Sequence, residues 1–360
     1  MTRVTRDRMA LGALVATSLA LAALLEDSAL SLYVLLLLSA IVTVGVSLVM
    51  GHAGQVTLGQ GAFYACGAYT AGVTATLGWP PLLGLALAPL AGAALAALIG
   101  VPLLLLRGHH LAFATLATHL IVLGLIGEMT ITGGDVGLQD IPRLSIGAIE
   151  LTSIRSYAYL SCLGLFSVVI ITRNLLRSRP GRALRALSSS EVAAASCGVP
   201  VGRYKLAVFA LSAGFAGLAG GIYAFHMGYL APGSFPVLLS IEYVVMAAVG
   251  GLGTVRGALI GSATVVILVD SLSRIATMSG MPSTAPVILS YAVYALLLIV
   301  AVLFLPGGIA ALLTSLTART ASRRATARAQ QRVPLPAGTS AMGVAHDAPG
   351  TPNSRQGSPS

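Results

Sequence analysis

Ten apolar runs, most of them close to the length of a bilayer crossing, are the feature that most constrains this chain. They lie at about 9–25, 29–50, 56–77, 82–106, 111–127, 156–172, 206–227, 237–253, 257–276 and 285–305. A helix of about 20 apolar residues spans a bilayer, and charged residues make up only 9% of this chain against about 25% in a soluble domain. The sequence therefore predicts an all-α polytopic membrane protein with about ten transmembrane or re-entrant helices. The third and eighth runs are the two for which re-entry is an alternative to crossing.

The order of the charges along the chain predicts its orientation. Arg3, Arg6 and Arg8 precede the first run, so we place the N-terminus in the cytoplasm, and ten crossings return the C-terminus there. This arrangement leaves 18 of the 21 basic residues inside and eight of the 11 acidic residues outside, as the positive-inside rule requires. The basic residues behind the net charge of +10 thus lie where membrane proteins carry them, and the charge does not indicate a nucleic-acid partner. Two halves of five crossings each would be inverted repeats.

The sequence divides into three regions. Residues 1–8 are expected to be a cytoplasmic N-terminus, and 9–310 a transmembrane domain with a long cytoplasmic connection at 173–205. The first run is expected to be retained, because no small-x-small cleavage site followed by a soluble domain comes after it. Residues 311–360 are rich in Ala, Arg, Pro, Ser and Thr, which predicts a disordered cytoplasmic tail.

No arrangement of residues suited to catalysis, metal binding or a cofactor is visible. The chain lacks an H-E-x-x-H zinc motif and a G-x-S-x-G nucleophile elbow, and its one lysine, Lys205, has no phosphate-binding loop around it. His109 and His110 have no acidic or Cys partner nearby. The three cysteines, Cys66, Cys162 and Cys197, have neither metal nor disulfide spacing. We therefore expect a protein that is not an enzyme and that binds neither metal nor cofactor.

Two polar pairs fall within apolar runs. His119 follows Thr115 by four residues on one helix face, and we favour a hydrogen-bonded histidine inside the bundle over a proton relay. Asp270 and Arg274 have the spacing at which helix neighbours form an ion pair, and a structural pair is favoured over a gate or a substrate contact.

The stretch 51–72, GHAGQVTLGQGAFYACGAYTAG, combines many glycines with amide and hydroxyl side chains. Non-helical backbone at membrane depth is tolerated only where it faces protein or a water-filled cavity, and interrupted helices often form transport sites. We favour a path-lining role, with close helix packing through small residues as the alternative. The predicted path residues are Gln55, Thr57, Gly59, Gln60 and Phe63 of this stretch, with Thr115, Ser240 and Glu242 from later runs.

The two longest connections suggest surfaces for partners. In the inner connection, Leu184 and Leu187, then Val192 and Ala195, recur at helical spacing, which predicts one or two short amphipathic helices. Such helices suit either a groove on a cytoplasmic protein or the lipid surface, and the residues alone favour neither. The acidic outer loop 128–155 is either a docking surface for an external partner or a solvated loop.

Taken in order, several of these segments resemble one known family. They are GQVTLGQGAFYACGAYTAG (54–72), RGHHLAFATLATHL (107–120), TGGDVGL (132–138), SRPGRALRALSSSEVAAASCGV (178–199), FALSAGFAGLAGGIYA (209–224), PGSFPVLLSIEYVVMAAVGGLGTVRGALIG (232–261) and FLPGGI (304–309). Over about 36–309 the chain is similar to the inner-membrane permease subunits of ABC importers for branched-chain amino acids, the LivH/LivM group, and closer to LivM.

The resemblance implies a permease that works with other subunits. These would be a second, LivH-like permease, two cytoplasmic ATPase subunits and an external substrate-binding protein, in a bacterial inner membrane. It also implies that the inner connection meets the ATPase through residues Arg182, Arg185, Glu191, Ala193, Ala194 and Gly198. The small-molecule substrate would be a branched-chain or related amino acid. The alternative is a stand-alone secondary transporter or channel for a small polar solute.

Overall fold

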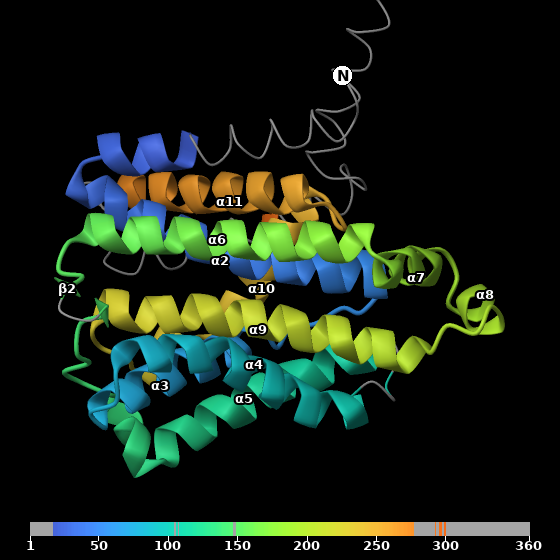
Figure 1. The fold of residues 1–360 in the computed structure, drawn as a ribbon, viewed down its shortest axis with the longest axis horizontal. Coiled ribbons are helices and arrows are strands. Elements are labelled where there is room, and N and C mark those ends of the chain that lie inside the picture. Colours follow the sequence, from blue (N-terminus) through green and yellow to red (C-terminus); the bar gives the residue numbers. More distant parts are fainter. Residues whose placement is uncertain are drawn as a thin grey trace, which may run out of the picture. The chain divides into compact units, whose positions relative to one another are not determined.

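The computed structural model describes residues 17–103, 106, 108–146 and 149–276, together with four isolated positions further on, 292, 295, 296 and 299. Within these ranges the chain is a bundle of helices (Figure 1). A helical segment over 17–24 is followed by α2 (Asp27–Ala53), α3 (Gln60–Thr76), α4 (Pro81–Leu103), α5 (His109–Glu128), α6 (Ile154–Arg177), α7 (Arg179–Ser189), α8 (Glu191–Ser196), α9 (Val201–Met227), α10 (Val237–Gly250) and α11 (Val255–Ala276).

These helices confirm the prediction of an all-α polytopic membrane protein. Seven segments of the described chain are long and apolar enough to cross a bilayer: α2, α4, α5, α6, α9, the segment Pro232–Gly250 and most of α11. The runs at 285–305 and at the start of 9–25 lie outside the described residues, as does the predicted tail. Two inverted halves therefore stay a prediction.

Helix α9 lies against α2, α3 and α4, and small residues bring these helices together. A Cβ atom added at Gly67 of α3 would lie 2.2 Å from the carbonyl oxygen of Gly217 in α9. One added at Gly220 of α9 would lie 1.9 Å from the carbonyl oxygen of Tyr64. Because the two backbones are nearly in contact, these glycines serve packing, the role that small residues commonly have between membrane helices.

Two helices are short and follow an interruption in the chain. Helix α2 ends at Gly54, whose φ of 63° is left-handed, and residues 54–59 are not helical before α3 begins. Helix α9 ends in the same way at Gly228, with a φ of 69°, and residues 228–236, which include the turn η3 (Pro232–Ser234), precede α10. Helices α3 and α10 have 17 and 14 residues. They correspond to the third and eighth apolar runs.

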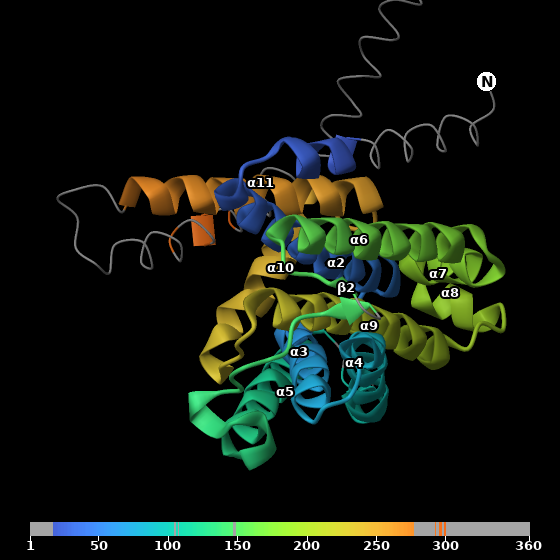
Figure 2. The same ribbon diagram turned by 60° about the vertical axis from the view of Figure 1, so that its left-hand side comes forward.

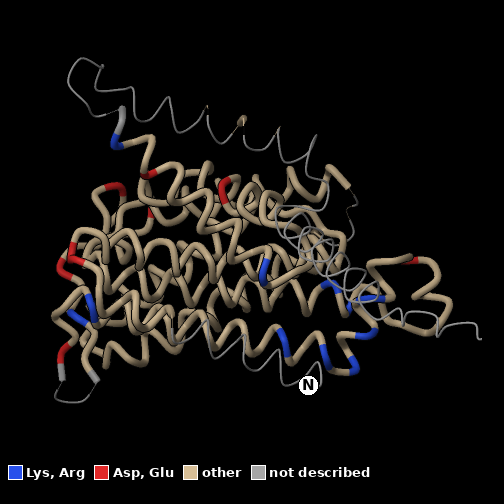
Figure 3. The backbone as a smooth tube through the Cα atoms, turned by 90° about the horizontal axis from the view of Figure 1, so that it is seen from above, with Lys and Arg blue, Asp and Glu red and all other residues tan. Residues whose placement is uncertain are grey.

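The two ends of the bundle differ in structure and in charge. At one end the connection after α5 contains the turns η1 (Thr130–Thr132) and η2 (Gly134–Val136) and a hairpin of β1 (Ser145–Ile146) and β2 (Ile149–Glu150). At the other end α7 and α8 extend away from α6 and α9 (Figures 1 and 2). Most Lys and Arg residues gather toward the α7–α8 end, and most Asp and Glu residues toward the other (Figure 3).

Candidate functional site

The beginnings of the two short helices meet inside the bundle. The backbone N–H of Gly61, in the first turn of α3, donates a hydrogen bond to Ser240 Oγ, in the first turn of α10, over 2.9 Å. Ser240 Oγ also lies 3.0 Å from Nδ1 of His119, in the middle of α5. One buried hydroxyl thus joins three helices that are far apart in the sequence.

Further hydrogen bonds attach α3 and the segment before it to α9 and α5. Gln60 Nε2 donates to Ser212 Oγ of α9 over 3.1 Å. The backbone N–H of Leu58 donates to Thr115 Oγ1 over 3.0 Å. We call this cluster the polar junction. We include in it the hydrogen-bonded side chains Gln60, Thr115, His119, Ser212 and Ser240, and also Gln55 and Thr57, which are buried in the non-helical segment before α3.

Three polar atoms of the junction have no hydrogen-bond partner among the described residues. They are the side-chain oxygens of Gln55 and Gln60 and Nε2 of His119, each of them buried. Buried polar atoms are nearly always paired, so unpaired ones indicate a place where water, an ion or a solute supplies the partner. The junction therefore has free hydrogen-bonding capacity where interrupted membrane helices commonly bind substrates.

The junction is closely packed in this structure. A Cβ atom added at Gly61 would lie 2.4 Å from Cε1 of His119 and 2.9 Å from Ser240 Oγ. One added at Gly59 would lie 2.9 Å from the carbonyl oxygen of Thr115. No side chain fits at either position without displacing its neighbours, so a solute passing here requires these helices to separate.

The structure brings most of the predicted path residues together, but two lie apart from the junction. Phe63 packs edge-on against Phe209 of α9, with ring centroids 5.4 Å apart, so its ring belongs to the apolar core. Glu242 lines a separate cavity of about 330 Å³ that also includes Tyr64, Tyr243 and Asp270. We call it the α10–α11 cavity, because those two helices supply most of its lining.

Of the two predicted polar pairs, Asp270 and Arg274 contact each other, whereas His119 and Thr115 each bond to other groups. His119 is fully buried, and its ring lies within hydrogen-bond distance of Ser240, as expected of a histidine inside the bundle. Thr115 shares its helix face but bonds to backbone groups, donating to the Ala112 carbonyl over 2.9 Å. Arg274 Nε lies 2.7 Å from Asp270 Oδ2, the pair expected from their spacing.

The inner connection forms the two predicted helices, but the apolar face differs from the predicted one. Leu184, Leu187 and Ala194 are buried, whereas Val192 is 78% exposed. Helical spacing does not continue from Leu187 to Val192 because Ser190 is extended, with a φ of −161°, and starts a new helix. The four apolar residues therefore do not share one face: Leu184 and Leu187 pack inward, whereas Val192 and Ala195 are exposed. The connection is also shorter than predicted, since α6 continues to Arg177 and α9 begins at Val201.

The other residues expected to meet the ATPase hold α7 and α8 in place or lie on their surface. Glu191 pairs with Lys205 of α9 over 2.8 Å. Arg185 Nη1 donates to the carbonyl oxygen of Leu176 over 2.6 Å, while Arg182 and Ala193 are exposed. Gly198 has a φ of 78°, which an L side chain rarely adopts, and this turn lets the chain reverse into α9.

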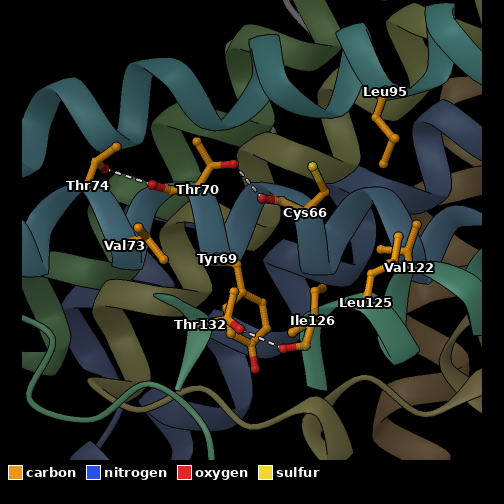
Figure 4. A pocket seen from close by; sticks show the side chains of 10 residues that line it. All are labelled: Cys66, Tyr69, Thr70, Val73, Thr74, Leu95, Val122, Leu125, Ile126 and Thr132. Carbon is orange, nitrogen blue, oxygen red and sulfur yellow. Dashed lines mark hydrogen bonds between the residues drawn. The ribbon is translucent and has the colours of Figure 1, made fainter. Parts of the chain in front are cut away.

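A larger cavity of about 430 Å³ lies between α3, α4 and α5 (Figure 4). Its lining contains aliphatic side chains, Cys66, Tyr69 and three threonines, and each threonine hydroxyl donates to a backbone carbonyl. Thr70 donates to Cys66, Thr74 to Thr70, and Thr132 to Ile126, over 2.6–2.7 Å. Apart from the Tyr69 hydroxyl, which has no hydrogen-bond partner among the described residues, the lining presents mainly apolar groups, and a polar solute would gain little there.

The described residues contain no group of three or more His, Cys, Asp or Glu side chains placed to hold a metal ion. Two contributors were missed by the sequence analysis. Ser212 is the partner of Gln60, and Tyr64 lines the α10–α11 cavity. Ser212 stands out in the sequence only as a polar residue in the middle of an apolar, glycine-rich run.

Interrupted helices that meet at a buried polar cluster, within a multi-pass membrane bundle, define the class of membrane transport proteins. Comparison with known proteins gives the family. The chain belongs to the family described as branched-chain amino acid transport system / permease component, whose sequence profile matches residues 28–302.

Two curated relatives belong to the LivM group. The high-affinity branched-chain amino acid transport system permease protein LivM of Salmonella typhimurium is 33% identical over 263 residues, and that of Escherichia coli 32%. Each alignment covers 65% of this chain and 61% of the relative, so the chain spans less than two thirds of the relatives' length. No solved structure matches.

Proposed function

We propose that this chain is the transmembrane permease subunit of an ATP-driven ABC importer that moves branched-chain or related amino acids into the cytoplasm. The observation that carries the proposal is the polar junction, where α3 and α10 begin after interruptions in the chain. The chain also belongs to the branched-chain amino acid permease family. Helix N-termini carry partial positive charge, which favours the carboxylate group of an amino acid. The predicted path residues of the junction would contact the solute when these helices separate.

The proposed assembly follows from what the chain lacks as well as from its relatives. Its sequence has no nucleotide-binding loop, so ATP must be hydrolysed by other subunits. We assign this role to two cytoplasmic ATPase subunits, with a second, LivH-like permease beside this chain and an external binding protein that delivers the substrate. The LivM relatives, which are named as permease proteins of a transport system, support this assignment.

The proposed location is a bacterial inner membrane, with both termini in the cytoplasm. The gathering of basic residues at the α7–α8 end supports this orientation, because cytoplasmic segments carry the excess of Lys and Arg. That orientation places α7 and α8 inside the cell, where we propose that they contact the ATPase. The exposed Val192 at the tip of α8 is the apolar group best placed to enter a groove.

Uptake of radiolabelled leucine, isoleucine and valine tests this function. The chain and its partner subunits would be expressed in cells that lack their own branched-chain uptake, with either the intact ATPase or one whose phosphate-binding lysine is replaced. We expect uptake only with the intact ATPase. Equal uptake with the inactive ATPase would identify a stand-alone transporter or channel, and an absence of uptake would refute the substrate class.

A further inference from the structure

The α10–α11 cavity carries chemistry that the polar junction does not use. Two carboxylates, Glu242 of α10 and Asp270 of α11, line it, and both are only partly exposed. Ionisable side chains within membrane helices are unfavourable unless they are paired or hydrated, and they commonly mark a solute or ion path. Asp270 is paired with Arg274, whose side chain is 68% exposed, so the basic partner lies toward the outside of this site.

Three tyrosines form a polar wall beside the carboxylates. The rings of Tyr64 and Tyr223 have centroids 5.6 Å apart, and those of Tyr64 and Tyr243 lie 6.2 Å apart. All three tyrosines belong to the lining, and Tyr64 is 4% exposed. A phenolic hydroxyl can donate and accept a hydrogen bond, so this wall suits a polar occupant.

Much of the remaining lining of the cavity is aliphatic, and we call it the aliphatic wall. It consists of leucines of α2 and α10 and valines of α11: Leu32, Leu35, Leu239, Val266 and Val269. The volume of about 330 Å³ is at the lower limit for small-molecule sites, which suits a solute of amino-acid size. The described lining contains two carboxylates and no Lys, Arg or His, while Arg274 pairs with Asp270 from beside it. Carboxylates accept hydrogen bonds from ammonium groups, so an ammonium is the charged solute group that this lining can hold.

We propose that the α10–α11 cavity is a binding site for the transported amino acid, in which Glu242 and Asp270 hold its α-ammonium group and the aliphatic wall holds its side chain. The site is distinct from the junction, because Ser240 contacts the junction while Glu242 and Tyr243 line the cavity. This inference rests on the proposed function, since it takes the solute to be an amino acid. It adds that recognition within the membrane depends on the ammonium group.

The first test is uptake by cells that express the full chain with its partner subunits. Glu242→Gln and Asp270→Asn keep nearly the same volume but remove the charge, and each should lower the maximal rate of leucine uptake by about tenfold, the scale of one charge-assisted hydrogen bond. The matched control is Glu26→Gln, an exposed acidic residue that precedes α2 and lies outside both sites. It should transport leucine like the parent.

The second test needs no transport and separates ligand contact from misfolding. In a chain without Cys66, Cys162 and Cys197, Ser39→Cys places a thiol in the cavity lining, and Ser271→Cys places one on the exposed face of α11. Leucine and isopentylamine, which has the ammonium group alone, should slow maleimide labelling of Ser39→Cys. The acid 4-methylpentanoate, which lacks that group, should not, and Ser271→Cys should be labelled equally in all cases.

The outcomes distinguish a failure of the proposed function from a failure of the proposed binding site. If the parent complex takes up no branched-chain amino acid, the proposed function fails. If the parent transports leucine while both charge variants match it, or if 4-methylpentanoate protects Ser39→Cys as well as isopentylamine does, this inference is overturned and the function stands. Slower uptake by the charge variants with amine-selective protection supports it.

Discussion

Replacing Gly61 by alanine tests the packing of the polar junction, because it leaves every polar side chain of the junction in place. The added Cβ atom would lie 2.4 Å from Cε1 and 2.8 Å from Nε2 of His119, where contacts of 3.4–4 Å are ordinary. The imidazole ring must therefore move, and its contact with Ser240 is lost with it. Overpacking a well-packed site typically costs about 1–3 kcal/mol, and a neutral hydrogen bond contributes about 1 kcal/mol.

This penalty is large enough to measure as a change in thermal stability. The two costs together are about 2–4 kcal/mol. With 360 residues and an unfolding entropy of about 2.1 cal/mol/K per residue, about 1 kcal/mol corresponds to a shift in Tm of about 1.3 °C, so Gly61→Ala should lower the Tm by about 3–5 °C. Uptake should be affected more strongly than stability, because the added Cβ atom displaces helices that must separate for the solute to pass. Gly124→Ala in α5 is the matched control, since nothing lies within 4 Å of its added Cβ atom.

A double-mutant cycle identifies the residue that is responsible. His119→Ala removes the ring that the new Cβ atom would meet, so Gly61→Ala should cost less in that background than in the parent. The expected coupling is about 1–2 kcal/mol, within the range for residues in contact. A Gly61→Ala protein with parental Tm and uptake, or additive effects in the double variant, would refute the packing that we describe.

Three further predictions concern the path, the partner contact and the orientation. Gly59→Leu should stop uptake while the chain still reaches the membrane at parental level, because its Cβ atom would lie 2.9 Å from the Thr115 carbonyl oxygen. Val192→Glu should reduce co-purification with the ATPase subunits by placing a charge at an exposed apolar tip. Glu191→Gln should act mildly, since an exposed ion pair contributes about 0–1 kcal/mol. In a cysteine-free background, Gly134→Cys should react with an impermeant thiol reagent from outside and Arg185→Cys only from inside; labelling of both from one face would contradict the proposed topology.

The positions of the membrane helices could be predicted because hydrophobicity is a local property of the chain. Each apolar run from 29–50 to 257–276 overlaps a helix in the described part of the chain. The helix ends were less predictable where a helix leaves the apolar run. Helix α9 begins at Val201, five residues before its apolar run at 206–227, because the polar residues there still satisfy their backbone hydrogen bonds within the helix.

The membership of the polar junction could be predicted in part, but its contacts could not. Gln55, Thr57 and Gln60 were recognisable because amides and glycines are rare in an apolar run. Their partners come from distant segments: Ser212 lies 152 positions after Gln60, and nothing local relates the two. The burial of Ala194 could not be predicted for a local reason. It depends on where one helix ends, at Ser189, and where the next begins.

Helix α10 connects the two sites that we assign to the solute. Ser240 on one side joins the junction, and Glu242 and Tyr243 line the cavity. Its far end is held to α2, because the backbone N–H of Gly253, just after α10, lies 3.0 Å from Ser47 Oγ. Helix α2 also packs against α7, next to the surface proposed to meet the ATPase. Contacts therefore run from α7 through α2 to the end of α10, the helix that carries residues of both the junction and the cavity.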